Sequence, residues 1–269
     1  MKKIIYIISL FVSSVLYTSC DALDLAPEDY FGSGNYWNNE AQVDGYMTGM
    51  HSQLRSYYDM FYVLGEVRGG TQRVGTSSEN TSLNYANLRS NVIDQDRPGI
   101  SNWYGLYSPI MQVNHFIQQV ENECSFLDTN RKHYLAQAYG LRALYYFMLY
   151  KTYGGVPIVT EVELLNGKVT ADKFYVERAT AEATLEFIKG DIQKSENNYA
   201  DITVTNSYDK TIWSKAATLM LKAEIYMWAA KVTITGHTAT GTTDLKVAQA
   251  ALNQIIGKFE LLSDFENVF

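Results

Sequence analysis

The sequence predicts an all-α protein whose helices are joined by long irregular loops. The first observation is a central block of apolar and tyrosine side chains that recur at alternating steps of four and three residues. The second is that other segments on both sides of this block show the same helical spacing. The third is the stretch 65–99, which is rich in Gly, Ser, Thr and Asn and follows no regular period. The central helical face consists of Tyr134, Ala138, Leu141, Tyr145, Met148 and Thr152.

The N-terminus has the layout of a secretory signal. Two lysines precede an apolar run from Ile4 to Leu16, and Cys20 follows shortly afterwards. The run of about 13 residues is shorter than the roughly 20 that span a bilayer, so we expect no transmembrane helix here. We predict a lipoprotein signal peptide over 1–19, lipid attachment at Cys20 and a lipidated tether over 20–39. The alternative is an ordinary signal peptide with an incidental cysteine.

The composition narrows the classes of partner. The 269 residues carry 29 acidic and 22 basic side chains, a formal net charge of −7. This balance argues against a nucleic-acid partner and against electrostatic attraction to acidic lipid. Because there are only two cysteines, lipidation of Cys20 leaves Cys124 unpaired, and we expect Cys124 to be a small buried hydrophobe. The 21 tyrosines suit both helix packing and stacking against sugar rings.

Two helices are predicted before the central block. The first spans 40–58, with Asn39 placed to cap it and Gln42 at the third helical position. The second spans 101–123, where we expect Trp103 to anchor the core, with a sugar platform as the alternative. The helical spacing of the second is carried by Trp103, Tyr107, Ile110, Asn114 and Ile117.

The third helix contains the central block and ends at residues that prevent its continuation. Gly154 and Gly155 allow the left-handed turn that closes many helices. Pro157 has no N–H donor and favours extended backbone in the preceding residue. Arg142 lies in the apolar part of this helix, where an unpaired charge is costly. We expect Arg142 to form a buried ion pair or to bind backbone carbonyls, with a ligand role as the alternative.

Three more helices are predicted, over 180–199, 211–231 and 244–256. Thr180 is placed to cap the first of them. Alanines recur along the second, which lets neighbouring helices approach closely. A polar loop is predicted over 234–243, and an extended apolar tail follows the last helix. Along 180–199, apolar positions are expected to face the core and charged positions to face water: Leu185, Ile188 and Ile192 against Glu182, Glu186 and Lys189.

The stretch 65–99 is the candidate ligand-binding segment. A loop this long without regular structure is uncommon in a compact domain, and such loops are usually functional or disordered. Its cations, amides and tyrosine suit the stacking of a sugar ring and hydrogen bonding to sugar hydroxyl groups. The candidate binding residues are Arg68, Gln72, Arg73, Asn80, Tyr85, Asn87 and Arg89.

The sequence gives little support for catalysis. It contains no phosphate-binding glycine loop and no nucleophile elbow, and no histidine pair has the spacing of a helical zinc site. Among carboxylates near the candidate segment, Glu66 with Asp94 or Asp96 is the pair to test against the spacing of a glycosidase. We therefore expect a binding protein with no catalytic residue and no cofactor. The sequence indicates no metal site, although the acidic loop residues permit calcium. The histidines are expected at the surface or as caps: His51, His115, His133 and His237.

Taken in order, these elements resemble the SusD/RagB family of outer-membrane nutrient-binding lipoproteins. The resemblance covers essentially the whole chain and implies tetratricopeptide-like helical pairs over 40–269. The motifs that carry it are Cys20, the Trp103 helix, Arg142-Ala143, Tyr153-Gly154-Gly155-Val156-Pro157, Arg178-Ala179-Thr180 and Lys215-Ala216-Ala217. We expect structural roles for Trp103, Arg142, Tyr153, Gly154 and Pro157.

The resemblance also implies a function. It implies a protein lipid-anchored in the outer membrane, with a SusC-like TonB-dependent transporter as partner and a glycan or oligosaccharide as ligand. Family members are commonly much longer, so the chain is expected to be the N-terminal part, with the C-terminal half missing. Two alternatives stay open: peptide uptake, with peptide carboxylates bound by Arg68, Arg73 and Arg89, and a helical-repeat scaffold that binds only protein.

Overall fold

The protein is described by a computed structural model that covers residues 36–70, 86–92, 94, 96, 103–160, 175–205, 211–260 and 263–264. Cys20, the predicted signal peptide and most of the predicted tether lie outside these residues. Within them the secondary structure is helical, and extended backbone pairs only at two isolated bridges, Pro157 with Arg178 and Ile234 with His237. The all-α prediction is therefore confirmed.

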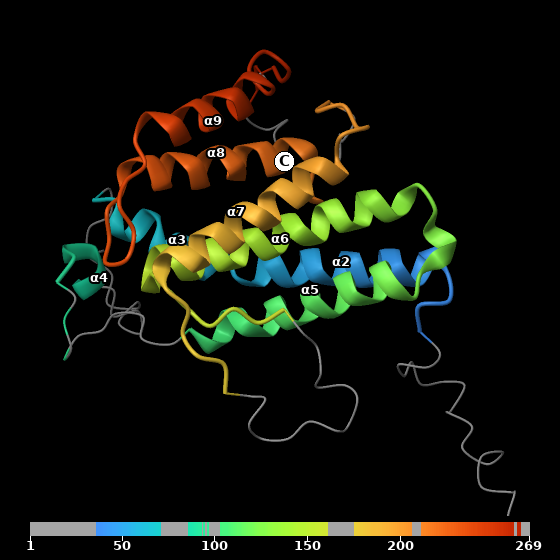
Figure 1. Ribbon diagram of the computed structural model, residues 1–269, viewed down its shortest axis with the longest axis horizontal. Coiled ribbons are helices and arrows are strands. Elements are labelled where there is room, and N and C mark those ends of the chain that lie inside the picture. The colour runs from blue at the N-terminus through green and yellow to red at the C-terminus, as the bar shows by residue number, and fades with distance from the viewer. Residues whose placement is uncertain are drawn as a thin grey trace, which may run out of the picture.

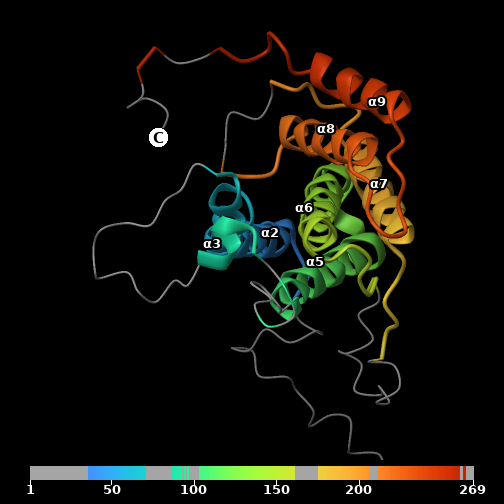
Figure 2. The ribbon, with the colours of Figure 1, turned by 90° about the vertical axis from the view of Figure 1, so that its left-hand side faces the viewer.

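The helices form a stack in which each member from α5 onward packs on the next. In Figures 1 and 2, α6 lies in the middle, α2 and α5 lie on one side of it, and α7, α8 and α9 lie on the other. The bounds are α2 (Glu40–Ser56), α3 (Tyr58–Leu64), η2 (Glu66–Arg68), α4 (Ala86–Ser90), α5 (Tyr104–Asn122), η4 (Ser125–Leu127), α6 (Asn130–Tyr153), α7 (Ala181–Asn198), α8 (Lys215–Lys231) and α9 (Thr242–Asn253).

Helix α6 is the axis of the hydrophobic core. Its side chains from Tyr134 to Tyr150 are buried on nearly every side, with Leu144 half-buried. Helix α7 runs back along it, since Ser195 near the end of α7 donates a 2.6 Å hydrogen bond to the carbonyl of Ala136 near the start of α6. Gly140 lets the indole of Trp213, just before α8, pack against α6, because a Cβ at position 140 would lie 2.2 Å from the indole nitrogen.

Side chains cap the helices where the sequence places capping residues. Asn39 accepts a 3.1 Å hydrogen bond from the amide of Gln42, whose side-chain oxygen accepts one of 2.8 Å from the amide of Asn38. Thr180 accepts from Ala183 at 3.1 Å, at the start of α7. These bonds satisfy N–H groups that have no partner within the helix.

Pro109 lies inside α5 without an evident break in the helix. Because proline has no N–H, the carbonyl of Gly105 one turn earlier loses its helical partner. The hydroxyl of Tyr57 donates to that carbonyl at 2.7 Å, which replaces the missing bond and fixes the start of α3 against α5.

Several boundaries differ from those predicted. The first helix ends at Ser56 rather than at 58, and the chain continues directly into α3 and η2. The second helix begins at Tyr104 and the fifth at Lys215, later than expected, because Ser214 caps α8. The last helix, α9, spans Thr242–Asn253 rather than 244–256, since turns replace helix from Gln254 to Gly257.

Two side-chain placements were predicted wrongly. Lys189 does not face water: its side chain is 13% exposed and its amine lies 3.0 Å from Asp244 of α9. Asp244 at the start of α9 and the ring of Tyr226 of α8, whose centre lies 5.0 Å from the amine, cover that position. His51 is buried rather than at the surface, and its Nε2 accepts a 2.8 Å hydrogen bond from the amide of Trp213. Cys124 is fully buried, as expected.

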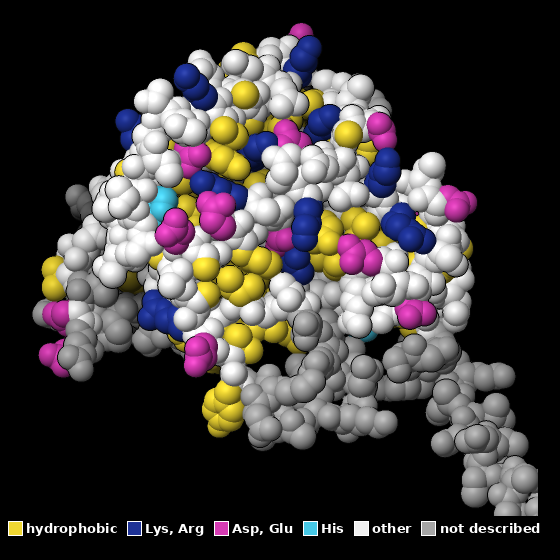
Figure 3. Space-filling view, in the orientation of Figure 1, with side chains coloured by type: hydrophobic (Ala, Val, Ile, Leu, Met, Phe, Trp, Pro, Cys, Tyr) yellow, Lys and Arg dark blue, Asp and Glu magenta, His cyan; other side chains and the backbone are white. Residues whose placement is uncertain are grey.

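The described surface mixes both signs of charge. In Figure 3, acidic and basic side chains alternate over the visible face, with hydrophobic side chains exposed between them. Within the described ranges, no helix has both the length and the apolar character needed to cross a membrane.

Candidate functional site

The structure describes two continuous parts of the segment 65–99, residues 65–70 and residues 86–92, which we call its arms. A small hydrophobic cluster joins the two arms. Val63 at the end of α3, Val67 of η2 and Leu88 of α4 form a small hydrophobic cluster of their own. Arg68 adds a 3.2 Å hydrogen bond from its Nε to the side-chain oxygen of Asn91. The expectation that this whole stretch lacks regular structure was wrong, because this cluster supports η2 and α4.

The candidate binding residues divide between these arms and the stretch between them. Arg68 is exposed on η2, and Arg89 is half-buried on α4. Asn87 also belongs to α4, but its side chain is not described. Gln72, Arg73, Asn80 and Tyr85 lie outside the described residues. The structure therefore places Arg68 on the first arm, in η2, and Arg89 on the second arm, in α4.

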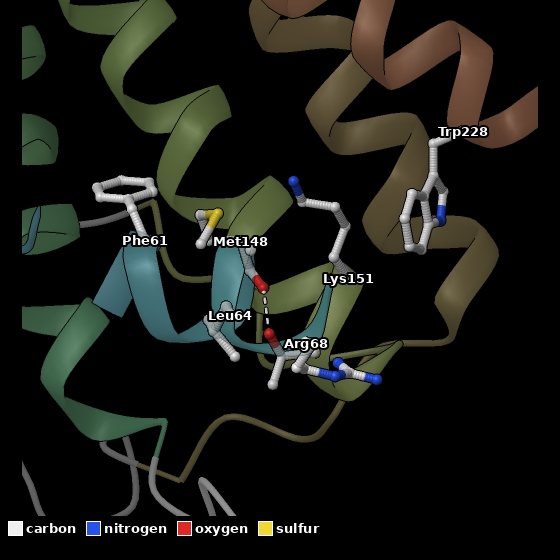
Figure 4. Close-up of a pocket in the computed structure, with 8 residues that line it drawn as sticks. Phe61, Leu64, Arg68, Met148, Lys151 and Trp228 are labelled. Carbon is white, nitrogen blue, oxygen red and sulfur yellow. Dashed lines mark hydrogen bonds between the residues drawn. The ribbon is translucent and has the colours of Figure 1, made fainter. Parts of the chain in front are cut away.

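A pocket of about 310 Å³ opens beside Arg68, at the C-terminal end of α6. Figure 4 shows Phe61 and Leu64 of α3 on one side of Lys151 and Trp228 of α8 on the other. The amine of Lys151 lies 2.7 Å from a carboxylate oxygen of Glu224 and 4.5 Å from the ring centre of Phe147. The full lining is Phe61, Leu64, Gly65, Arg68, Met148, Lys151, Thr152 and Trp228.

A second pocket, of about 510 Å³, adjoins the first and shares Lys151, Thr152 and Trp228 with it. Its other walls are the turn after α6, the segment that enters α7 and the hairpin that follows α8. Arg178, from the entry to α7, lines it, and the guanidinium of Arg178 lies 5.6 Å from the ring centre of Trp103. Together the pockets form a two-part hollow at this end of the bundle.

The turn after α6 is fixed by backbone geometry. Gly154 has φ +74°, a conformation that side chains disfavour. A Cβ on Gly155 would lie 2.0 Å from the carbonyl oxygen of Ala179, so only glycine fits there. Arg178 donates hydrogen bonds to the carbonyls of Tyr153 and Gly155, which satisfies acceptors that the helix end leaves open. Trp103 packs edge-on against Tyr153 at 5.7 Å between ring centres.

Arg142 supports this end from within the core. Its Nε and Nη2 donate to both carboxylate oxygens of Asp191 at 2.6 and 2.8 Å, and its Nη1 donates to Asn114 at 2.9 Å. The two charged side chains are 5% and 1% exposed. Burial would lower the pKa of Arg142, but its bonds to Asp191 and the charge of Asp191 outweigh burial and raise it. Of the two structural possibilities, the structure shows the ion pair, and it joins α5, α6 and α7.

The same group of polar side chains positions the backbone that leaves α6. Asn114 donates to the carbonyl of Val159 at 2.8 Å, and the hydroxyl of Tyr146 accepts from the amide of Val159 at 2.8 Å. Tyr107 donates to the carbonyl of Pro157 at 2.6 Å. Burial raises the pKa of Tyr146 to about 12, so this hydroxyl stays neutral. Residues 156–160 are therefore held rigidly against α5 and α6.

Sequence reasoning missed the pocket residues Lys151 and Trp228. Each lies in the last turn of its helix, and every second helix of an antiparallel stack ends at the same side, so the two residues can be placed together only once the order and directions of the helices are known. Within the described ranges, no group of three metal-binding side chains comes together. The hollow offers apolar walls, indole and phenol rings, and cations, which suit non-covalent binding.

Comparison with known proteins places the chain in a family. Residues 23–227 match the SusD-like family described as starch-binding and associating with the outer membrane. A SusD-like protein of Formosa agariphila is 28% identical over 230 residues, which make up 84% of this chain and 42% of that protein.

Solved structures of SusD-type proteins superpose on this chain. A SusD superfamily protein of Bacteroides fragilis NCTC 9343 superposes with a TM-score of 0.73 and 32% identity, over 87% of this chain and 47% of that one. For B. fragilis NanU the values are 0.72 and 31%, over 91% and 47%. A laminarin-binding SusD-like protein shares the fold at a TM-score of 0.65 and 19% identity, over 86% and 48%. The chain spans less than half the length of these relatives, and it belongs to the SusD-like family.

Proposed function

We propose that this protein is a cell-surface lipoprotein that binds glycan oligosaccharides and delivers them to a SusC-like TonB-dependent transporter of the outer membrane. The observation that carries the proposal is the family match over residues 23–227, to a family described as starch-binding and outer-membrane-associated. The hollow beside the candidate segment supplies a place for the ligand.

Binding is proposed to be non-covalent. Aromatic rings stack against the apolar faces of sugar rings, while amide and guanidinium groups bind the hydroxyl groups. Arg68 and Arg89 lie on the two arms of the segment, and Gln72, Arg73, Asn80, Tyr85 and Asn87 complete the proposed set. We expect weak affinity, because sugars are well hydrated and their polar groups must lose water to bind. The ligand is released unchanged, as expected of a binding protein rather than an enzyme.

The membrane anchor is proposed to be lipid on Cys20. Each buried methylene contributes about 0.8 kcal/mol, so more than one acyl chain gives durable attachment. Labelled palmitate should be incorporated into the wild-type protein and not into Cys20→Ser.

The first test measures oligosaccharide binding by the whole chain. A glycan array identifies a ligand, and calorimetry compares the wild type with the double variant Tyr85→Ala/Arg89→Ala. We expect binding to be abolished in the double variant, because it removes one stacking ring and one cation, while circular dichroism stays unchanged.

A matched control removes an exposed aromatic and a cation at the opposite end of α6, in Phe126→Ala/Lys132→Ala. This control should bind like the wild type. Unchanged affinity in the Tyr85/Arg89 variant would refute the assigned site, and an array that captures only peptides would favour peptide uptake over glycan capture.

A further inference from the structure

The two adjoining pockets carry an unusual distribution of charge. Arg68 lines the first, Arg178 lines the second and Lys151 lines both, yet among the residues that the structure describes no acidic residue lines either one. The chain as a whole carries more acidic than basic residues. An all-cationic lining on an acidic protein is therefore a local feature that the overall composition does not explain.

Nearby negative charge offsets only part of this excess. Glu224 pairs with Lys151 at 2.7 Å and contributes one carboxylate. The C-terminal end of α6 adds about half a negative charge from its backbone dipoles. Three cations against these contributions leave an excess of positive charge at the hollow. Arg68 and Glu224 are both exposed, so the balance is open to a competing anion from solvent.

The walls of the hollow are apolar and aromatic. Trp228 is half-buried and lines both pockets, and Phe61, Leu64 and Met148 line the first. Tyr150 lines the second, is 1% exposed, and its hydroxyl has no hydrogen-bond partner among the residues that the structure describes.

We propose that this hollow binds a carboxylate-bearing sugar unit, with Lys151 bound to the carboxylate, Trp228 against the ring of the sugar and Arg68, on the other side of the pocket (Figure 4), adding electrostatic attraction. This inference rests on the proposed glycan-binding function and specifies the class of glycan. Aromatic walls select a ring with an apolar face, and the two cations select an anion over a neutral sugar. The combined volumes suit more than one sugar unit, so the acidic unit occupies part of a longer oligosaccharide.

The test compares acidic sugars with their uncharged forms. Calorimetry on the full chain uses trigalacturonate and sialyllactose, each beside its own methyl ester, which keeps the sugar and removes the charge. We expect at least one acid to bind about tenfold more tightly than its ester, as charge-assisted hydrogen bonds require. That preference should weaken as salt is raised from low to physiological concentration, because Arg68 is exposed.

Single substitutions test which side chains cause the preference for the acid over its ester. Lys151→Gln should remove most of the roughly tenfold preference for the acid over the ester and leave binding of the ester unchanged, whereas Arg68→Gln should lower the preference by a smaller factor and also weaken binding of the ester. Glu224→Gln should strengthen binding of the acid, because it frees Lys151 from its carboxylate partner. Lys132→Gln is the matched control, since it removes an exposed, paired lysine at the other end of the same helix.

The outcomes separate this inference from the proposed function. Equal binding of acids and esters, or a preference that survives both Arg68→Gln and Lys151→Gln, would overturn the inference while glycan binding stands. Binding of acidic peptides in place of sugars, or no binding of any glycan on the array, would overturn both.

Discussion

The guanidinium of Arg142, which lies on α6, binds side chains of two neighbouring helices, α5 and α7. Its bonds to Asp191 of α7 and to Asn114 of α5 are made by side chains that are almost wholly excluded from water. Rings of Tyr139 and Phe187 lie 5.2 and 5.3 Å from it, which shields the pair further. Through Asn114 the group also holds the carbonyl of Val159, so a single residue fixes helix packing and the path of the chain after α6.

Removing the partner of Arg142 should strongly lower the stability of the folded protein. In Asp191→Ala the guanidinium stays buried without its counter-charge, and we expect the free energy of unfolding to fall by about 3–5 kcal/mol. Urea denaturation followed by circular dichroism measures this. Asp201→Ala breaks the exposed pair with Lys132 and should cost less than about 1 kcal/mol. A similar small loss for both variants would show that the buried pair does not hold the helices together.

At the residue scale, the sequence predicts that a group needs a partner more readily than it predicts which partner. A lone charge in an apolar helix indicates a buried ion pair, but Asp191 lies 49 positions away and only the packing of α7 on α6 selects it. His51 is a second case. It follows Val43 and Met47 at the spacing of a buried helical face, but its bond to the amide of Trp213 spans 162 positions, so the sequence does not indicate that partner.

At the scale of elements, three independent features constrain the turn at the end of α6. Gly154 supplies positive φ, Gly155 allows contact with the backbone of Ala179, and Arg178 binds the last carbonyls. These residues form the floor of the second pocket, so the stop signal of the helix also shapes the hollow.

Two glycine-to-alanine variants test that account in opposite directions. Gly155→Ala places a methyl group into the carbonyl of Ala179 and should destabilise the protein by about 1–3 kcal/mol or more. Gly190→Ala, in the middle of α7, meets nothing within 4 Å and should stabilise it by roughly 0.5–1 kcal/mol. Thermal unfolding of both compares them directly. A stable Gly155→Ala protein would contradict the close approach at this turn.

The long helices were predictable because their apolar residues repeat with the helical period over many turns. The short ones were not, since α3 has seven residues and α4 has five, too few to be stable alone. The small cluster of Val63, Val67 and Leu88 supports them, and that cluster joins residues on both sides of the candidate segment. Tertiary packing therefore determines the structure where the helix propensity of a short segment is too weak to do so.

At the scale of the whole molecule, the antiparallel stack gives the bundle two distinct ends. The ends of α6 and α8 meet α3 and η2 at one of them, so Arg68, Lys151 and Trp228 gather from positions far apart in the chain. Sequence alone identified Arg68, because it lies in the polar segment. It could not place Lys151 and Trp228 beside it, because that requires the helix order and directions.

Hydrogen exchange of the full chain, with and without a saturating oligosaccharide from the array, tests the central claim that one end of the helical stack binds glycan. We predict slower exchange over 65–99 and in the last turns of α6 and α8, and no change over 124–133 at the opposite end. Protection confined to 124–133, or unchanged exchange at the α6 end while calorimetry reports binding, would contradict the account.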